Sequence, residues 1–182
     1  MNKTLKNNNY IFIDNFISKE KAQELYKQFK KDIKAHPNEF KKDTQCPKSF
    51  SIYNYRPFLE LLTNKTSYIS DLIGEPVLPT YTYARLYQKG EVLEKHKDRP
   101  SCEISVTLNL GGDKDWEIFF TKPNGEQVSL NMTQGQGALY LGCESEHWRE
   151  AFKGKEYAQV FLHYVRSNGP NWIHCFDRIN QN

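Results

Sequence analysis

The chain has 182 residues, of which 38% are hydrophobic and 14% are aromatic, and its formal net charge is +3. This length suffices for one hydrophobic core and excludes two ordinary domains, so we expect a single domain over residues 1–182. No apolar run approaches the roughly 18 residues that a membrane-spanning helix needs, and the N-terminal residues lack the apolar segment of a secretory signal. We therefore expect a soluble, unprocessed protein without a membrane partner.

Lysines outnumber acidic residues in the first 48 residues, and such an excess usually forms a solvated basic face, with acidic partners left open. The four cysteines are far apart, and no pair has C-x-x-C spacing. This excludes a zinc ribbon and a dense disulfide framework, and it favours a reducing, cytoplasmic location.

The first part of the chain predicts a helical support region over residues 1–78. Residues 10–14, YIFID, predict a strand, and Ser18 is a suitable N-cap for a helix whose apolar residues recur at helical spacing. A second helix is predicted over residues 57–73, with a glycine directly after it. The polar segment between the helices predicts one short strand near residues 50–53.

From residue 79 onward, β-branched and aromatic segments alternate with turn residues, which is typical of antiparallel β-structure. The segments are TYTYARLYQ, EVLEKH, CEISVTLNL, WEIFFT, QVSLN, GALYLG and YAQVFLHYV. So many short strands predict a closed or two-sheet barrel over residues 79–166, followed by a tail over 167–182. Asn124 and Gly125 predict a hairpin turn between two of the strands.

A candidate metal site begins in EKHKDRP, where His96 and Asp98 stand two positions apart and point the same way if the segment is extended. The other histidine that directly follows a glycine-flanked strand is His147, in GQGALYLGCESEHWRE. Two histidines and one carboxylate on one face leave three adjacent coordination positions open, which suits non-heme Fe(II) and its oxygen chemistry. H-x-D alone is often a surface turn, but its combination with this strand and the later histidine is more specific.

These motifs resemble those of the 2-oxoglutarate- and Fe(II)-dependent dioxygenases, and within them the prolyl-4-hydroxylase-like group. The resemblance covers about residues 80–165, through YARLYQKGEVLEKHKD, CEISVTLNL, GQGALYLGCESEH and YAQVFLHYV. It implies a mainly β fold with flanking N-terminal helices, a double-stranded β-helix, also called a jelly roll or cupin-like barrel. It also implies that His96, Asp98 and His147 are the iron ligands and that Tyr87 lines the cosubstrate pocket.

The sequence departs from that family where a lysine or arginine usually binds the distal carboxylate of 2-oxoglutarate, directly before an aromatic residue. Here Glu156 precedes Tyr157, and a carboxylate cannot bind another carboxylate. Arg149 is our first candidate for the missing cation, because it shares a strand face with His147 if that segment is extended. A guanidinium also binds a carboxylate through two hydrogen bonds.

Other charged residues have weaker claims to a place in the site. Lys155 is the second candidate cation, since a one-residue shift would turn it inward, and Arg85 is the third, since it shares a face with Tyr87. Either could instead be a surface charge or a salt-bridge partner. Arg99 could orient the neighbouring aspartate or recognise substrate, whereas His163 is expected to be a hydrogen-bonded structural histidine.

The resemblance implies that Fe(II), 2-oxoglutarate and dioxygen, with ascorbate as a stimulant, hydroxylate a C–H bond of a substrate. The expected substrate is a prolyl or other amino-acid side chain, in a protein, in a peptide or in a small molecule. A nucleic-acid base is an alternative, but the sequence lacks clearly interleaved aromatic and basic residues, so a nucleic-acid partner is disfavoured. Two other hypotheses stay open: a cupin-like metal-binding or sensor module without turnover, and a β-sandwich with an accidental H-x-D.

Overall fold

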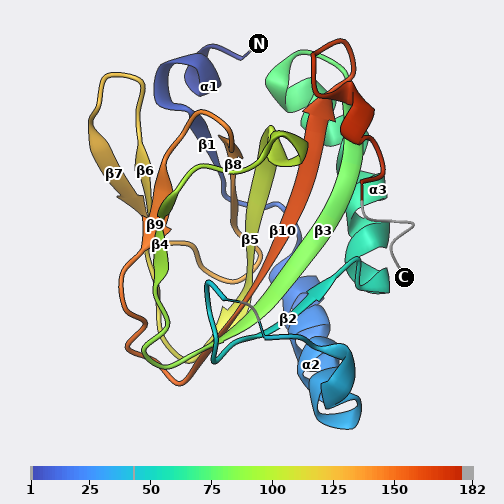
Figure 1. Ribbon diagram of the computed structural model, residues 1–182, viewed down its shortest axis with the longest axis vertical. Coiled ribbons are helices and arrows are strands. Elements are labelled where there is room, and N and C mark those ends of the chain that lie inside the picture. The colour runs from blue at the N-terminus through green and yellow to red at the C-terminus, as the bar shows by residue number, and fades with distance from the viewer. Residues whose placement is uncertain (1, 43, 178–182) are drawn as a thin grey trace.

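The computed structural model describes residues 2–42 and 44–177, and it consists of two facing β-sheets with helices along the outer side of the larger sheet (Figure 1). The helices are α1 (Lys3–Asn8), α2 (Lys19–Ala35) and α3 (Arg56–Ile73), with short 3-10 helices at Pro37–Glu39, Pro100–Cys102 and Trp172–His174. The strands are β1 (Tyr10–Ile13), β2 (Phe50–Tyr53), β3 (Val77–Gln88), β4 (Leu93–His96), β5 (Ile104–Gly112), β6 (Ile118–Thr121), β7 (Gln127–Leu130), β8 (Gly137–Leu141), β9 (His147–Arg149) and β10 (Glu156–Arg166). In the described part of the chain, no helix has both the length and the apolar character needed to cross a membrane.

The strands form a six-stranded sheet in the order β1-β8-β5-β10-β3-β2 and a four-stranded sheet in the order β4-β9-β6-β7. Every pairing between these strands is antiparallel. Two facing antiparallel sheets, between which the chain passes back and forth from β3 to β10, make a double-stranded β-helix, so the predicted fold class is confirmed.

The two long helices begin and end close to where the sequence predicts. The Ser18 hydroxyl accepts a hydrogen bond from the Lys21 N–H at 3.1 Å and caps α2. α3 has Pro57 in its first turn and ends at Gly74, whose φ of 79° places it in the left-handed region that glycine adopts without steric cost.

The short helix α1 is absent from the sequence-based prediction. It buries a single residue, Leu5, so it has no apolar periodicity to detect. Its N-cap Asn2 instead makes tertiary contacts: the Asn2 backbone N–H donates to the Ile73 carbonyl, and its side-chain amide donates to the Leu72 carbonyl. These contacts with the end of α3 position α1, and no local pattern encodes them.

The main core lies between the six-stranded sheet and the helices, because alternate residues of the strands point toward α2 and α3. This helix-facing side is apolar, and its fully buried members on the three central strands include Ala84, Val106, Leu108, Leu110, Ala158, Val160, Leu162 and Tyr164. They pack with helix residues such as Leu25, Phe29, Phe58, Leu62 and Ile69. Burial of each large apolar side chain here contributes about 1.5–3 kcal/mol.

The opposite side of the same three strands faces the four-stranded sheet and forms the interior of the barrel. It carries many polar and aromatic side chains: Tyr81, Tyr83, Arg85 and Tyr87 of β3, Ser105, Thr107 and Asn109 of β5, and Tyr157, Gln159, Phe161 and His163 of β10. A barrel kept only for stability would fill this space with apolar residues, since buried polar groups without partners are costly. The interior is therefore where a functional site is expected.

The predicted hairpin turn and the predicted C-terminal tail can also be compared with the structure. Residues 122–126 close the β6–β7 hairpin, and Gly125 adopts a φ of 85° there, which explains the glycine at this turn. Of the predicted tail 167–182, the described part contains the Trp172–His174 turn and returns to β3, where the Phe176 N–H donates to the Pro79 carbonyl. Residues 178–182 lie outside the described part of the chain.

Candidate metal centre

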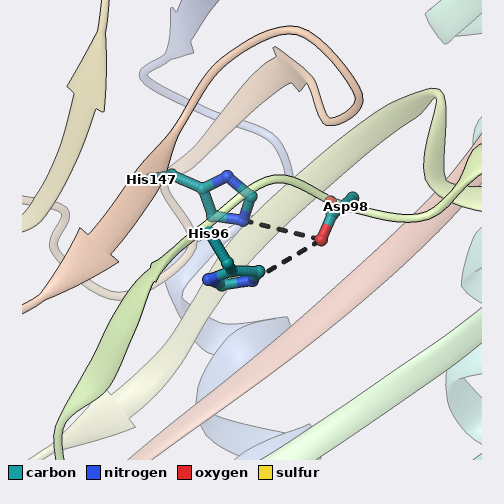
Figure 2. A group of neighbouring side chains, drawn as sticks. All are labelled: His96, Asp98 and His147. Carbon is teal, nitrogen blue, oxygen red and sulfur yellow. Dashed lines mark ion pairs between the residues drawn. The ribbon is translucent and has the colours of Figure 1, made fainter.

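The structure brings His96, Asp98 and His147 together at one end of the barrel interior (Figure 2). His96 is the last residue of β4 and His147 is the first of β9, and these two residues are directly paired in the four-stranded sheet. Asp98 follows in the loop after β4. Its Oδ1 lies 3.7 Å from His96 Nε2 and 3.6 Å from His147 Nε2, so the three ligand atoms converge on one point.

Both histidines are oriented so that Nε2 faces this point. His96 Nδ1 lies 2.7 Å from the Glu94 carbonyl, and His147 Nδ1 lies 3.0 Å from the Ser145 carbonyl. A carbonyl accepts a hydrogen bond from Nδ1–H, which leaves the Nε2 lone pair available to a metal. Burial also lowers the pKa of His147, which keeps this imidazole neutral and able to act as a ligand.

The second oxygen of Asp98 is bound from β5. The Ser105 hydroxyl lies 3.2 Å from Asp98 Oδ2 and 3.1 Å from the Cys102 carbonyl, so these two acceptors share its one proton, and it contacts His163 Nδ1 at 2.8 Å. Burial lowers the pKa of His163 to about 4, so its imidazole is neutral and its Nδ1–H can donate to Ser105. His163 thus has the hydrogen bond expected of a structural histidine, and Ser105 fixes which Asp98 oxygen faces the two ligand histidines.

The loop that carries Asp98 also packs closely against Gly142, which follows β8. The Asp98 N–H donates to the Gly142 carbonyl at 2.9 Å. A Cβ atom added at Gly142 would lie 2.2 Å from the Cys102 carbonyl oxygen and 2.6 Å from Asp98 Oδ2, so a side chain there would displace the carboxylate. Glycine at this position is therefore a steric requirement of the site.

A second group of ligand-type atoms overlaps the first: Asp98, Cys102 and His163 also lie within 4.8 Å of one another. Burial, followed by the charge of Asp98, raises the pKa of the Cys102 thiol to about 12. A protonated thiol is a poor ligand, since metals bind the thiolate. The two-histidine group is therefore the better metal site.

A cavity of about 220 Å³ opens beside the three residues. Its walls include aromatic side chains and cations, namely Tyr53, Tyr81, Tyr83, Tyr140, Phe161, Arg85, Lys97 and Arg99. Arg99 lies 4.7 Å from the centre of the Tyr81 ring, donates to the Tyr81 hydroxyl and pairs with Asp177 at 3.1 Å. These contacts place its guanidinium on the cavity wall, while Ser105 rather than Arg99 binds the Asp98 carboxylate.

Arg149 points into the interior from β9, two residues beyond His147, and its side chain is fully buried. Its guanidinium carbon lies 4.9 Å from the Trp116 ring centre and 5.3 Å from that of Tyr157, and Nη1 donates to the Trp116 carbonyl. Nε and Nη2 have no hydrogen-bond partner among the described residues. A fully buried guanidinium with two unused donors is costly unless an anion binds it.

Arg85 and Tyr87 lie on the adjoining wall of the interior. Arg85 Nη1 donates to the Tyr87 hydroxyl at 3.2 Å, and Arg85 Nη2 donates to Gln45 Oε1 at 2.7 Å. Tyr87 is fully buried, and burial raises its pKa, with a smaller opposing effect from Arg85. Both terminal nitrogens of Arg85 therefore already donate hydrogen bonds to other side chains, whereas Nε and Nη2 of Arg149 donate none to the described residues.

Lys155 does not reach the site. Its side chain is exposed, and its backbone N–H bonds to the Asp113 carboxylate. The inward shift that would have turned Lys155 toward the barrel does not occur, because β10 is paired with Tyr157 opposite Tyr87.

Glu156 lies on the helix side of the sheet, where it pairs with Lys30 and accepts a 2.6 Å hydrogen bond from the Tyr26 hydroxyl. Burial tends to raise the pKa of Glu156, but the hydrogen bonds from Lys30 and Tyr26 outweigh it and lower that pKa. Both partners come from α2. The carboxylate that stands in place of the usual cation is therefore neutralised outside the barrel and does not oppose an anion inside it.

The structure adds residues that the sequence analysis did not select. Ser105 and Tyr140 face the interior from β5 and β8, Gln45 reaches it from the loop before β2, and Tyr53 lies at its edge. The available signal was the polar alternation of ISVTLNL, in which serine, threonine and asparagine fall on one face of a strand. The positions of Gln45 and Tyr53 depend on tertiary pairing alone.

No protein-family model and no curated protein sequence matches this chain. Solved structures match it closely in shape. A prolyl-4-hydroxylase from Pseudomonas putida superposes with a TM-score of 0.69 at 14% identity, covering 89% of this chain and 95% of the other. A prolyl hydroxylase from Trichoplax adhaerens, in complex with a hypoxia-inducible-factor peptide fragment, gives 0.70 at 13% identity, covering 88% and 86%.

HygX from Streptomyces hygroscopicus, with nickel and 2-oxoglutarate bound, gives a TM-score of 0.71 at 10% identity, covering 91% and 85% of the two chains. The chain therefore has the fold of 2-oxoglutarate-dependent oxygenases over nearly its whole length. At these identities the likeness establishes the architecture, and any claim about chemistry rests on the residues of the site.

Proposed function

We propose that the protein is a non-heme Fe(II)- and 2-oxoglutarate-dependent dioxygenase that hydroxylates a C–H bond. One observation carries this proposal: a cluster of two histidines and one carboxylate lies near Arg149, two residues after His147 in the sequence. The Arg149 guanidinium is buried, and its Nε and Nη2 have no hydrogen-bond partner among the described residues. A dicarboxylate that reaches from the metal cluster into the barrel would satisfy both features. The shared fold supports the same proposal.

The residues of the cluster fit the implied metal. His96, Asp98 and His147 would bind Fe(II) and leave adjacent positions open, and histidine with carboxylate is the ligand set that suits this ion. When bound, Fe(II) and 2-oxoglutarate would supply the oxidation of an unactivated C–H bond by dioxygen, with ascorbate as a stimulant. The protein's own contribution is to bind, orient and exclude water.

In this proposal, Arg149 is the residue that binds the distal carboxylate of 2-oxoglutarate. Its guanidinium is oriented by Trp116 and Tyr157, and burial keeps competing water away. The Tyr157 hydroxyl also lacks a hydrogen-bond partner among the described residues and can donate to the same carboxylate. Tyr87 and Arg85 form the adjoining wall, and Arg85 is the second candidate for this contact.

The substrate within this proposal is a prolyl or other amino-acid side chain, in a peptide or protein. The cavity beside the cluster, of about 220 Å³, has Tyr81, Tyr83 and Phe161 in its walls, which suit an aliphatic side chain. We treat residues 1–182 as one domain in which 1–78 support the barrel of 79–166. A reducing, cytoplasmic location is part of the proposal, and the wide spacing of the four cysteines in the sequence favours it.

The test compares Arg149→Ala with Lys155→Ala, a matched loss of one cation at a site that the structure leaves exposed. Arg149→Ala should weaken 2-oxoglutarate binding by roughly 3 kcal/mol, about a hundredfold, and leave Fe(II) binding nearly intact. Lys155→Ala should change both affinities by less than about twofold. Anaerobic calorimetry measures both, and the weak visible absorption of the Fe(II)–2-oxoglutarate chelate reports binding independently.

Three outcomes would contradict parts of the proposal. An unchanged affinity in Arg149→Ala would move the anchor to Arg85. No chelate absorption in the wild-type protein would remove 2-oxoglutarate as cosubstrate. Chelate absorption without any succinate, under air with Fe(II) and ascorbate, would favour a metal-binding sensor module over an oxygenase.

A further inference from the structure

A groove of about 1040 Å³ adjoins the metal cavity along the open side of β2. It lies between the segment that precedes β2 and the start of α3, and its lining shares four residues with the smaller cavity: Gln45, Tyr53, Tyr83 and Arg85. A ligand in the groove can therefore reach the metal cluster without leaving the protein surface. At nearly five times the volume of the metal cavity, the groove has room for a ligand larger than a free amino acid, such as a peptide.

We propose that this groove binds an acidic peptide segment, with carboxylate side chains flanking the residue that enters the metal cavity. The inference rests on the proposed function, which places the reacting C–H bond beside His96, Asp98 and His147. It adds a substrate class that the metal cluster alone does not define.

The charge of the groove is the first support for this proposal. Its lining contains the cations Lys41, Lys42, Arg56 and Arg85, against which the described lining offers one carboxylate, Glu39. The excess continues into the metal cavity, where Lys97 and Arg99 flank Asp98. Arg56 and Arg99 pair with acids outside the lining, at Glu60 and Asp177, and the lysines still give both cavities a positive field.

One of the two groove lysines, Lys41, is bridged to the sheet through its backbone. The backbones of Lys41 and Ser51 exchange two hydrogen bonds, of 2.8 and 2.9 Å, and the Ser51 hydroxyl also donates to the Lys41 carbonyl. This bridge continues the six-stranded sheet beyond β2. A lysine placed on such a scaffold costs less conformational entropy when it pairs with a carboxylate.

The aromatic residues of the groove favour a peptide over a nucleic acid. Tyr53 is the most exposed of them, at 43%, and its ring centre lies 4.5 Å from that of Tyr83, which it partly covers. Tyr55 bonds through its hydroxyl to Asp32, and its ring packs against Phe29. Sites for single strands stack successive bases on several open rings, whereas this groove presents one.

The test measures binding by fluorescence anisotropy on the full chain without metal. The probes are a labelled peptide of alternating Glu and Pro, the matched Gln–Pro and Lys–Pro peptides, and a single-stranded oligonucleotide of the same charge as the acidic peptide. The groove variant is Lys41→Glu with Lys42→Glu. The control variant is Lys31→Glu with Lys34→Glu, which makes the same change of charge at exposed positions of α2 outside the groove.

The groove variant should bind the Glu–Pro peptide about tenfold or more weakly than the wild type, and the control variant should differ by less than about twofold. The wild type should also prefer the Glu–Pro peptide to the Gln–Pro and Lys–Pro peptides. Melting temperatures of both variants establish that they fold. With Fe(II), 2-oxoglutarate and air, the Glu–Pro peptide should raise succinate release above its background in the wild type and less so in the groove variant.

Several results would overturn the inference. Equal losses in the two variants would show a general charge effect, and equal binding of Glu–Pro and Gln–Pro would remove the role of carboxylates. Tighter binding of the oligonucleotide through the same lysines would assign the groove to nucleic acid. A protein that binds Fe(II) and 2-oxoglutarate but not the acidic peptide contradicts this inference alone. A protein that binds the acidic peptide in the groove but has no affinity for Fe(II) or 2-oxoglutarate contradicts the proposed function alone.

Discussion

The two sides of β3, β5 and β10 belong to the same strands but bury very different side chains. The helix-facing side consists of residues such as Leu108, Val160 and Leu162, which pack on α2 and α3. The barrel-facing side carries residues such as Ser105, Arg85 and Gln159. One side therefore stabilises the fold, and the other is available for chemistry.

The difference appears also in unused hydrogen-bonding capacity. Asn109 Oδ1, Gln159 Oε1, the Tyr157 hydroxyl and two nitrogens of Arg149 are buried on the barrel-facing side without a hydrogen-bond partner among the described residues. An unsatisfied buried polar group costs about 1–3 kcal/mol. A protein retains several such groups in one space when a ligand satisfies them. Mutations on the barrel-facing side should therefore change ligand binding, whereas mutations on the helix-facing side should change stability. Measuring stability and metal binding for the same variants distinguishes the two effects.

The largest difference between the effect on Fe(II) binding and the effect on stability is expected from His147→Ala, on the barrel-facing side. Loss of a ligand should weaken Fe(II) binding by at least about a thousandfold, because changes to supporting residues already cost ten- to a hundredfold. The melting temperature should stay close to that of the wild type. Anaerobic titration and metal analysis measure the effect, and His36→Ala, at an exposed histidine, is the control. His96→Ala and Asp98→Ala should weaken Fe(II) binding in the same way as His147→Ala. Stoichiometric Fe(II) in any ligand variant would remove that residue from the site.

The opposite behaviour is expected from Leu162→Ala on the helix-facing side. The side chain is fully buried, and its truncation leaves a cavity in the core, so the free energy of unfolding should fall by about 3 kcal/mol. Fe(II) bound per folded molecule should not change. Urea unfolding and metal analysis of the folded fraction measure the two quantities. A variant that loses iron while remaining folded would show that the two sides are coupled.

A smaller effect is expected from Ser105→Ala, which removes the hydrogen bond to Asp98 Oδ2 while retaining all three proposed ligands. Fe(II) affinity should fall by about tenfold, since residues that orient a ligand contribute ten- to a hundredfold. Ser129→Ala, at an exposed serine of β7, serves as the control. An unchanged affinity would show that the Gly142 backbone contact alone positions the carboxylate.

The smallest effect is expected from Glu156→Gln, where β10 meets α2. The hydrogen bonds from Lys30 and Tyr26 lower the pKa of Glu156 in the folded state, so the carboxylate stabilises the protein above its unfolded-state pKa of about 4.5 and loses that contribution as the pH falls. The variant should be about 1 kcal/mol less stable at neutral pH, and the difference should vanish in acid. Unfolding curves at several pH values measure this, and a difference independent of pH would contradict it.

Strand parity explains which parts of the site the sequence could predict. His96 and Asp98 are two residues apart, as are His147 and Arg149, and alternate residues of an extended segment face the same way. That rule predicted the inward direction of Arg149 correctly. It could not place Lys155, because the register of β10 is set by its pairing with β3.

Other features depend on contacts between distant segments. Glu156 stands in the sequence where the resembled family has its cation, and its partners Lys30 and Tyr26 lie on a helix far away in the sequence. The groove arises because β2 pairs with β3 and places Tyr53 beside Tyr83. No local sequence pattern encodes these contacts, so they could be found only from the fold.

The position of β10 has a consequence for how the protein is made. β10 is the last strand of the sheets in chain order, yet it lies between β5 and β3. On the ribosome, two half-sheets, β2–β3 and β1–β8–β5, can form before residues 156–166 emerge, each with an unpaired edge that invites aggregation. All three proposed ligands are therefore synthesised before the strand that joins the half-sheets, and the six-stranded sheet can be completed only after that strand has left the ribosome.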